Sequence, residues 1–138
     1  MSDESIKVFM DTNVLIYAYS ETEPEKKEKV LALLEQKAVC LSTQVINEFI
    51  WTMSKKFSIA MDLLKPVTHN FFSMYEVFLL DEGAIVKAID LVQQRHFSYW
   101  DSLILSAALR TNCNILYTED LQHGQVIDNK LTISNPFI

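Results

Sequence analysis

The stretch IKVFMDTNVLIYAY, residues 6–19, places one acidic residue between two apolar runs. Its first half predicts a short buried strand that ends near Met10, and its second half predicts a helix. Asp11 stands between the two, where desolvation of a carboxylate costs several kcal/mol unless a partner compensates it. Asp11, Thr12 and Asn13 are all favourable N-cap residues, so a helix cap is one explanation. The other acidic residues of the chain decide between a cap and a functional site.

The composition is typical of one globular domain. With 138 residues, the chain is within the usual range for one domain, and we expect residues 1–138 to form a single unit. The scarcity of Gly (2) and Pro (3) favours long helices over an all-β fold. The net charge of −6 argues against a simple basic nucleic-acid binder.

Three features predict a cytoplasmic protein without a membrane anchor. No run of 18 apolar residues is present. The start, MSDESIK, has neither the basic part nor the apolar part of a signal peptide. Cys40 and Cys113 each lie in an apolar stretch, so we expect two buried free thiols, as in a reducing compartment.

Periodicity and capping residues predict alternating strands and helices. Strands are expected at about 6–10, 38–42, 76–80, 114–118 and 131–134. Helices are expected at about 24–36, 42–57, 58–75, 81–94 and 98–111, with a kink or a division into two helices at Pro66. This alternation indicates an α/β protein with a mainly parallel sheet covered on both faces. In such sheets ligands bind at the carboxyl ends of strands, where Asp11 and the TED sequence at 118–120 are expected.

Asp101 lies near the middle of the apolar side of its helix. On a helical wheel, three apolar residues share its side: Ile104, Leu105 and Ala108. Three polar residues fall on the far side, which we expect to face away from the core: Ser102, Ser106 and Arg110. Asp101 also fits a capping box with Ser98, but capping does not require the apolar side. A functional role is therefore favoured, although both roles can coexist.

The remaining acids are less informative one at a time. Glu48 lies at the margin of the buried side of its helix, and Glu119 and Asp120 follow a strand, where turn acids are common. No Lys or Arg is adjacent to any of these acids in the sequence. Like charges about 4 Å apart repel by about 1 kcal/mol in water and about 4 kcal/mol at an effective dielectric of 20. A converging set therefore needs compensation, and carboxylates are the ligands that Mg²⁺ or Mn²⁺ prefers.

Four segments resemble the acidic motifs of the PIN-domain nucleases: MDTNVLIYAY, STQVINEFIW, YWDSLILSAAL and LYTEDLQHG. The resemblance covers about residues 6–137, and its motif acids are Asp11, Glu48, Asp101 and Asp120, in the order of the family. The ending, TEDLQHGQVIDNKLTISNPF, is similar to the tail of the VapC-like ribonuclease toxins of bacterial toxin–antitoxin pairs. The Thr-x-Asp spacing selects Asp120 over its neighbour Glu119.

The resemblance implies a three-layer α/β/α sandwich and an endoribonuclease that depends on Mg²⁺ or Mn²⁺. It implies that the four motif acids hold the metal ion and catalyse hydrolysis of RNA phosphodiester bonds by a metal-activated water. It implies that Asn13 and Thr118 support these acids. An antitoxin partner that blocks the site, and a homodimer through helices flanking the cleft, are also implied.

Basic and aromatic residues near the motifs are candidates for RNA contacts. Four cations can form a local track for phosphates: Lys55, Lys56, Arg95 and Arg110. Tyr99 or Trp100 can stack on an unpaired base. The ordinary alternative is that the cations are solvated and the aromatic rings pack in the core.

Two other functions fit parts of the pattern. Asp11 at a strand end could be the nucleophile of an aspartyl-phosphate phosphatase, but that chemistry wants a second Asp where Asn13 stands. A non-catalytic PIN-like interaction module could hold a structural metal ion or none, and retention of all four acids argues against it. An RNA-cleavage assay with Mn²⁺ and with EDTA separates these alternatives.

Overall fold

The first strand of the chain lies in the middle of the sheet. The computed structural model describes residues 6–138. The expectation that the start, MSDESIK, is not a signal peptide therefore falls mostly on residues outside the described part. The strand order is β3-β2-β1-β4-β6-β5. The strands are β1 (Lys7–Met10), β2 (Ala38–Ser42), β3 (Glu76–Phe78), β4 (Ile115–Tyr117), β5 (Val126–Ile127) and β6 (Leu131–Ser134). All neighbouring pairs are parallel except β5–β6, which confirms the expected mainly parallel sheet.

Polar side chains cap three of the longer helices. The helices are α1 (Thr12–Leu15), η2 (Ile16–Tyr19, 3-10), α2 (Pro24–Gln36), α3 (Thr43–Lys55), α4 (Met61–Met74), α5 (Glu82–Arg95) and α6 (Tyr99–Arg110). Ser42, Asp81 and Ser98 each accept a hydrogen bond from a backbone N–H in the first turn of α3, α5 and α6. Each cap satisfies one of the N–H groups that a helix start leaves free.

Residues 58–75 were expected to kink or to divide into two helices at Pro66, and of these alternatives the division is wrong, because α4 is one helix that contains Pro66. Pro66 lies in the second turn, where its ring removes a single N–H from the helix. Buried apolar residues on both sides of Pro66 offset this loss. Leu64 and Phe71 both pack into the core, and the ring of Phe71 meets that of Phe49 edge to face at 5.0 Å.

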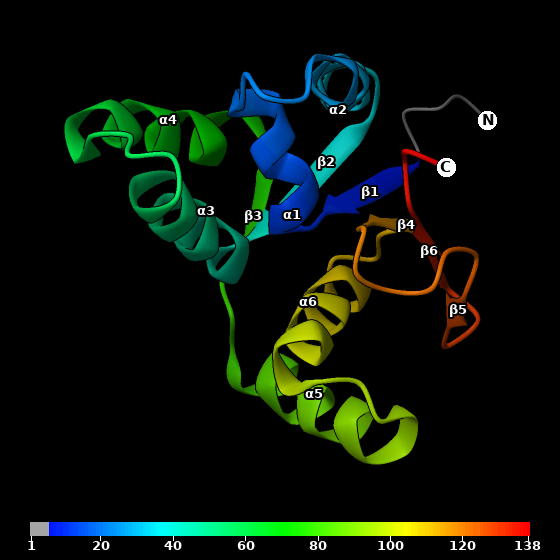
Figure 1. Cartoon of the computed structure of the whole chain (residues 1–138). Helices are drawn as coiled ribbons and strands as arrows, with labels where there is room; N and C mark the ends of the chain where they lie inside the picture. The colour runs from blue at the N-terminus through cyan, green and yellow to red at the C-terminus, as the bar shows by residue number, and fades with distance from the viewer. Residues whose placement is uncertain (1–5) are drawn as a thin grey trace.

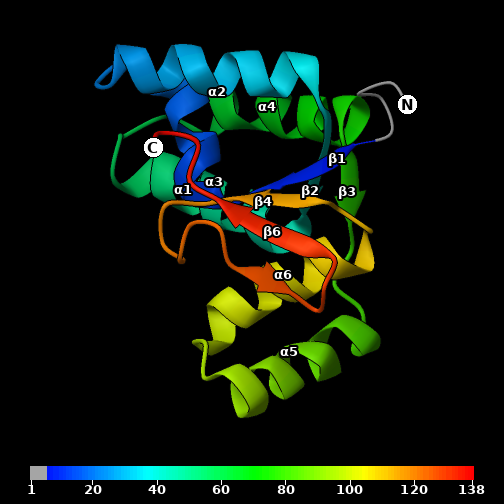
Figure 2. The same ribbon diagram turned by 90° about the vertical axis from the view of Figure 1, so that its right-hand side faces the viewer.

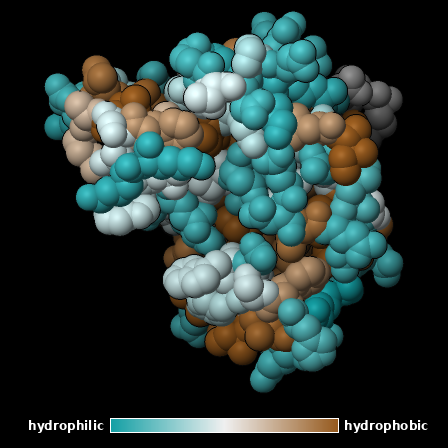
Figure 3. Space-filling view, viewed as in Figure 1, coloured by the Kyte–Doolittle hydropathy of each residue, from teal (hydrophilic) through white to brown (hydrophobic). Residues whose placement is uncertain are grey.

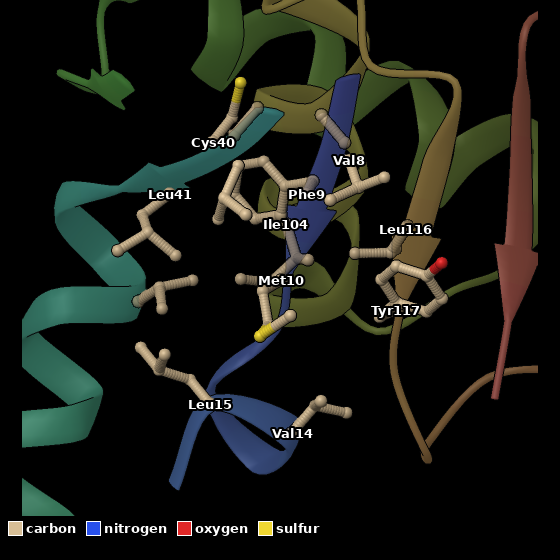
Figure 4. Close-up of a cluster of buried hydrophobic side chains, with 14 of the residues drawn as sticks. Val8, Phe9, Met10, Val14, Leu15, Cys40, Leu41, Ile104, Leu116 and Tyr117 are labelled. Atoms are coloured by element: carbon tan, nitrogen blue, oxygen red, sulfur yellow. The ribbon is translucent and has the colours of Figure 1, made fainter. Parts of the chain in front are cut away.

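Two layers of helices cover the sheet. Helices α2 and α4 lie on one side, α6 packs on the other side, and α5 packs against α6 (Figures 1 and 2). Apolar side chains of the central strands, such as Met10 and Leu116, meet Ile104 from α6 in a shared core (Figure 4). This is the expected three-layer α/β/α arrangement. No helix within residues 6–138 is long and apolar enough to cross a membrane.

Helix α6 is buried on both of its sides, which corrects the helical-wheel expectation. Ser102 and Ser106 were expected to face away from the core, yet both are fully buried. The reason is that α5 covers this side of α6. Ser106 Oγ donates a 2.7 Å hydrogen bond to the carbonyl oxygen of Ala84 on α5, so the hydroxyl is satisfied there.

The sheet changes its winding direction at β1. From β1 the chain adds β2 and β3 on one side, and β4 then pairs with β1 on the other side. Cys40 on β2 and Cys113 before β4 are buried free thiols, as expected. The carboxyl ends of β1 and β4 form the topological switch point, where open α/β sheets bind their ligands.

Candidate active site

Asp11 is the residue directly after β1. Its N–H donates to the Tyr117 carbonyl oxygen at 3.0 Å and so continues the pairing of β1 with β4. Its carboxylate accepts a 2.7 Å hydrogen bond from the Thr12 N–H and a 2.9 Å bond from Thr118 Oγ1. The residue is only 6% exposed. Asp11 therefore caps α1 and also holds a carboxylate at the switch point, so the two explanations are compatible.

The surroundings of Asp11 oppose its ionisation. Burial is the main cause that raises the pKa of Asp11 to about 7; the hydrogen bonds from Thr118 and Thr12 limit the rise, and the negative charges of Glu48 and Asp120 add to it. A desolvated carboxylate beside other carboxylates is stabilised when a cation is bound next to it. Asp11 is therefore suited to bind a cation.

All four motif acids line one cleft of about 530 Å³, which we call the acidic cleft: Asp11, Glu48, Asp101 and Asp120. The surface is hollowed between the part formed by α3 and α4 and the part formed by α5 and α6 (Figure 3). Within residues 6–138, none of the four acids forms an ion pair with Lys, Arg or His. The cleft therefore concentrates negative charge without a compensating side chain.

Glu48 is held toward this cleft by Thr12. Thr12 Oγ1 donates a 2.8 Å hydrogen bond to Glu48 Oε1 and so connects the start of α1 to the middle of α3. Thr12 lines the cleft and is buried, whereas its sequence context indicated only a capping role. Its position directly after Asp11 was the one available signal.

Glu119 and Asp120 differ in their surroundings although they are adjacent. Glu119 accepts a 2.8 Å hydrogen bond from the Tyr17 hydroxyl and forms a 3.0 Å ion pair with Lys26. Asp120 lines the acidic cleft, and its N–H donates to Thr118 Oγ1 at 3.1 Å. This difference supports the choice of Asp120 from the Thr-x-Asp spacing.

Thr118 and Asn13 connect the acids at the switch point. Besides donating to Asp11, the Thr118 hydroxyl oxygen accepts from the Asp120 N–H and, at 3.4 Å, from Asn13 Nδ2. Asn13 Oδ1 accepts from the Glu119 N–H, also at 3.4 Å. The geometry thus brings both residues to the position expected for supporting groups.

Two of the four candidate cations lie near the cleft. Lys55 Nζ stands 5.0 Å from the centre of the Trp51 ring, which lines the cleft. Lys56 lines a neighbouring hollow that shares Asn13 and Thr52 with the acidic cleft.

The other two cations lie elsewhere. Arg95 lies 3.7 Å from Asp128, and Arg110 forms a 2.9 Å ion pair with Asp81, so the structure does not bring them to the cleft. Of the two aromatic candidates, Trp100 lines the cleft, and Tyr99 packs edge to face against Trp100 at 5.4 Å.

The chemistry of these residues fits a divalent cation. Within residues 6–138, no three His, Cys, Asp or Glu side chains form an assembled metal site. Mg²⁺ does not require one, because it keeps several waters and is commonly bound through one or two carboxylates. Asp11 would be the central ligand, since it is fixed by two hydrogen bonds, with the other acids reached directly or through water.

Comparison with known protein families gives a clear result. A family model described as PIN domain matches residues 8–128. The chain belongs to the PIN-domain family. The four acids of its cleft all lie within the matched range. A sequence comparison with curated proteins gives no match.

Solved structures share this PIN fold at low sequence identity. VapC20 of Mycobacterium tuberculosis, described as a Sarcin-Ricin loop cleaving toxin, has a TM-score of 0.68 and 13% identity, covering 82% of this chain and 89% of its own. A toxin–antitoxin complex from Klebsiella pneumoniae has a TM-score of 0.69 and 18% identity, covering 94% and 97%. VapBC2 of Rickettsia felis, bound to a promoter DNA fragment, has a TM-score of 0.66 and 20% identity, covering 94% and 100%.

Proposed function

We propose that this PIN domain is an endoribonuclease that depends on Mg²⁺ or Mn²⁺ and acts as the toxin of a toxin–antitoxin pair. The observation that carries the proposal is the acidic cleft, where four carboxylates line one hollow at the β1–β4 switch point and have no cationic partner among residues 6–138. Residues 1–138 would act as one nuclease domain in the cytoplasm. The similar solved structures, which include a toxin described as cleaving the Sarcin-Ricin loop and a toxin–antitoxin complex, support this assignment.

A divalent cation in the cleft would stabilise charge on the phosphate and make a nearby water more acidic. Asp11, Glu48, Asp101 and Asp120 would hold that ion and orient the water and the scissile phosphate. Thr118 and Thr12 keep Asp11 and Glu48 in place through their hydroxyl hydrogen bonds. Lys55 and Lys56, near the rim, would attract RNA phosphates.

Cleavage of a fluorogenic RNA oligonucleotide tests the nuclease activity. We expect cleavage with Mn²⁺ or Mg²⁺, none with EDTA, and none from Asp11→Asn. Glu35→Gln, an exposed charge change on α2, is the matched control and should cleave like the wild type. Products with a 5′-phosphate and a 3′-hydroxyl support attack by water, whereas a 2′,3′-cyclic phosphate would contradict it.

Growth of a bacterial host tests the toxin assignment separately. Expression of the wild-type chain should slow growth, and Asp11→Asn at a matched protein level should not. Equal growth with both proteins would argue against a toxin and leave the nuclease to be judged by the cleavage assay. The antitoxin would be a protein that covers the cleft and suppresses cleavage when it is added.

A homodimer is part of the proposal. Three apolar residues on α5 are 40–50% exposed: Ile85, Val86 and Ile89. Apolar surface also covers much of α5 in the space-filling view (Figure 3). Such a surface on α5, which packs against the cleft-lining helix α6, fits a contact between two copies. A monomer in sedimentation at micromolar concentration would contradict it.

A further inference from the structure

A second hollow continues from the acidic cleft. It has a volume of about 720 Å³. It shares Gln44, Asn47, Glu48, Trp51 and Trp100 with the acidic cleft, so the two spaces form one continuous surface. We call this second hollow the tryptophan pocket.

Both tryptophans of the chain border this pocket, and both are unusually exposed. Trp51 on α3 is 63% exposed and Trp100 on α6 is 65% exposed. Large aromatic rings are rarely left so open in a folded protein unless they contact a ligand or partner. Lys55 Nζ lies 5.0 Å from the centre of the Trp51 ring, which puts a positive charge at the edge of the pocket.

Two amide side chains add polar groups to the lining of the pocket. Gln44 is 7% exposed, and its Nε2 donates to the Trp100 carbonyl oxygen at 3.3 Å. Its Oε1 is buried and has no hydrogen-bond partner among the described residues. A buried acceptor without a partner is costly, so a ligand that donates a hydrogen bond there would be favoured. Asn47, which is exposed and lines both spaces, offers a further donor and acceptor.

We propose that the tryptophan pocket binds an unpaired RNA base next to the scissile phosphate, with Trp51 and Trp100 as stacking surfaces and the amides of Gln44 and Asn47 at the edge of the base. This inference rests on the proposed nuclease function and adds a substrate subsite to it. Aromatic rings bind single-stranded nucleic acid by stacking on successive bases, and each base has a flat face for this contact. Substrates with an unpaired base at the cleavage position would therefore be selected over continuous duplex.

The chemistry of the pocket favours a base over a protein side chain. The pocket opens directly onto the acids expected to act on a phosphate, so a nucleotide that spans both spaces would place its phosphate and its base in adjoining sites. The Lys55 ammonium complements a neighbouring phosphate. An aliphatic protein segment would leave the buried Gln44 oxygen without a partner.

Intrinsic fluorescence can test the proposal, because the chain has 2 tryptophans and both border the pocket. The measurement uses the full chain with Asp11→Asn, which prevents cleavage during titration. Trp51→Phe and Trp100→Phe in that background each leave one reporter. We expect an unstructured RNA oligonucleotide to quench the emission of both reporters. An abasic oligomer of the same length and a blunt RNA duplex should quench much less.

Alanine variants test the contribution of each ring to affinity. Trp51→Ala and Trp100→Ala should each weaken RNA binding about tenfold, the lower part of the range for one stacked base. The control is Phe72→Ala, which removes an exposed ring on α4 outside the pocket and should bind RNA unchanged. Circular dichroism confirms that each variant is folded.

Several results would overturn the base pocket. One is that abasic RNA quenches the fluorescence as much as normal RNA does. Another is that the Trp51→Ala and Trp100→Ala variants bind RNA as tightly as Phe72→Ala does. Loss of self-association in the tryptophan variants, with RNA binding intact, would identify a protein interface instead. If the wild type cleaves RNA but RNA does not quench the fluorescence, the proposed base-binding pocket is rejected and the proposed nuclease function is retained. If RNA quenches the fluorescence but the wild type does not cleave RNA, the proposed nuclease function is rejected and the proposed base-binding pocket is retained.

Discussion

Thr118 Oγ1 donates a 2.9 Å hydrogen bond to Asp11 Oδ2, although the two residues are 107 positions apart in the chain. Each residue directly follows a central strand, Asp11 after β1 and Thr118 after β4, and these strands pair in parallel. One hydroxyl thus fixes the orientation of the most buried acid at the switch point. The same hydroxyl oxygen accepts the Asp120 N–H, so it also positions a second acid.

Replacing Thr118 tests this orientation. Thr118→Val removes the hydroxyl at nearly constant shape, and we expect it to weaken Mn²⁺ affinity by roughly 10–100-fold. Thr118→Ser keeps the hydroxyl and should retain most of the affinity. Isothermal titration calorimetry with Mn²⁺ measures the affinities of both variants. Equal affinities for the Val and Ser variants would show that the hydrogen bond does not control the site.

Asp101→Asn tests whether the acid at the start of α6 acts in catalysis or only in capping. The cap is made by the Asp101 N–H, which donates to Ser98 Oγ at 3.1 Å, and Asn keeps this N–H. We therefore expect cleavage to fall by roughly 100-fold or more, because ion binding is worth several kcal/mol of transition-state stabilisation. Stability without metal should be retained. The rate and a thermal melt in EDTA check both expectations.

Ser98→Ala is the complementary change. It removes the cap acceptor, so the free energy of unfolding should fall by about 1 kcal/mol while most cleavage remains. Mn²⁺ at about 100 times its Kd should stabilise the wild type by about 2.7 kcal/mol, and Asp101→Asn much less. An active Asp101→Asn protein would exclude the Asp101 carboxylate from catalysis.

The adjacent acids Glu119 and Asp120 provide a matched pair. Asp120→Asn should reduce cleavage by roughly 100-fold or more, because its carboxylate lines the acidic cleft. Glu119→Gln should retain cleavage, because the Glu119 carboxylate is engaged by Tyr17 and Lys26. The initial rate of RNA cleavage at saturating Mn²⁺ compares them. The reverse order of the two effects would move the fourth acid to Glu119.

Asp11 should make the metal-free protein less stable as the pH rises. Its folded-state pKa is about 7, above its ordinary value of 3.8, so between these values the folded state binds more protons than the unfolded state. Stability from this group is therefore lost as the pH rises from about 4 to 7. Asp11→Asn removes this dependence and should exceed the wild type in stability by on the order of 1–3 kcal/mol at pH 8 in EDTA. Urea unfolding at pH 5 and pH 8 measures the difference.

Asp128 is the control for this pH series. The hydrogen bond from Lys87 lowers the pKa of Asp128, so its contribution is present above its ordinary pKa and lost only as the pH falls toward the folded-state value. The stability difference between the wild type and Asp128→Asn should thus be nearly constant between pH 5 and pH 8. Parallel curves for the wild type and Asp11→Asn over this range would contradict the role assigned to burial.

The positions of Asp11 and Asp120 could be predicted because they follow from local patterns. A short apolar run that ends in an acid predicts a strand end, and parallel strands bring such ends to one edge. Asp11 and Asp120 are therefore recognisable from the sequence. The Thr12–Glu48 hydrogen bond was not predictable, because it depends on how α1 and α3 meet in the folded chain.

Other features depend on partners that are distant in the sequence. Ser106 is polar, so its pattern indicated the side of α6 facing away from the core, yet α5 covers it and accepts its hydrogen bond. Arg95 looked free to bind phosphate, but its position near Asp128 depends on the segment after β5. Strand β5 spans only Val126–Ile127, too short for an alternating pattern to be visible.

The central position of β1 has a consequence for the timing of synthesis. The ribosome makes Asp11 and Glu48 early, but β4, the strand that completes the switch point, is formed by residues 115–117. Until that segment emerges, β1 has an open edge, Asp11 lacks the Thr118 hydrogen bond, and Asp120 does not yet exist. A growing chain therefore has no complete cleft until the segment from β4 to Asp120 has been made.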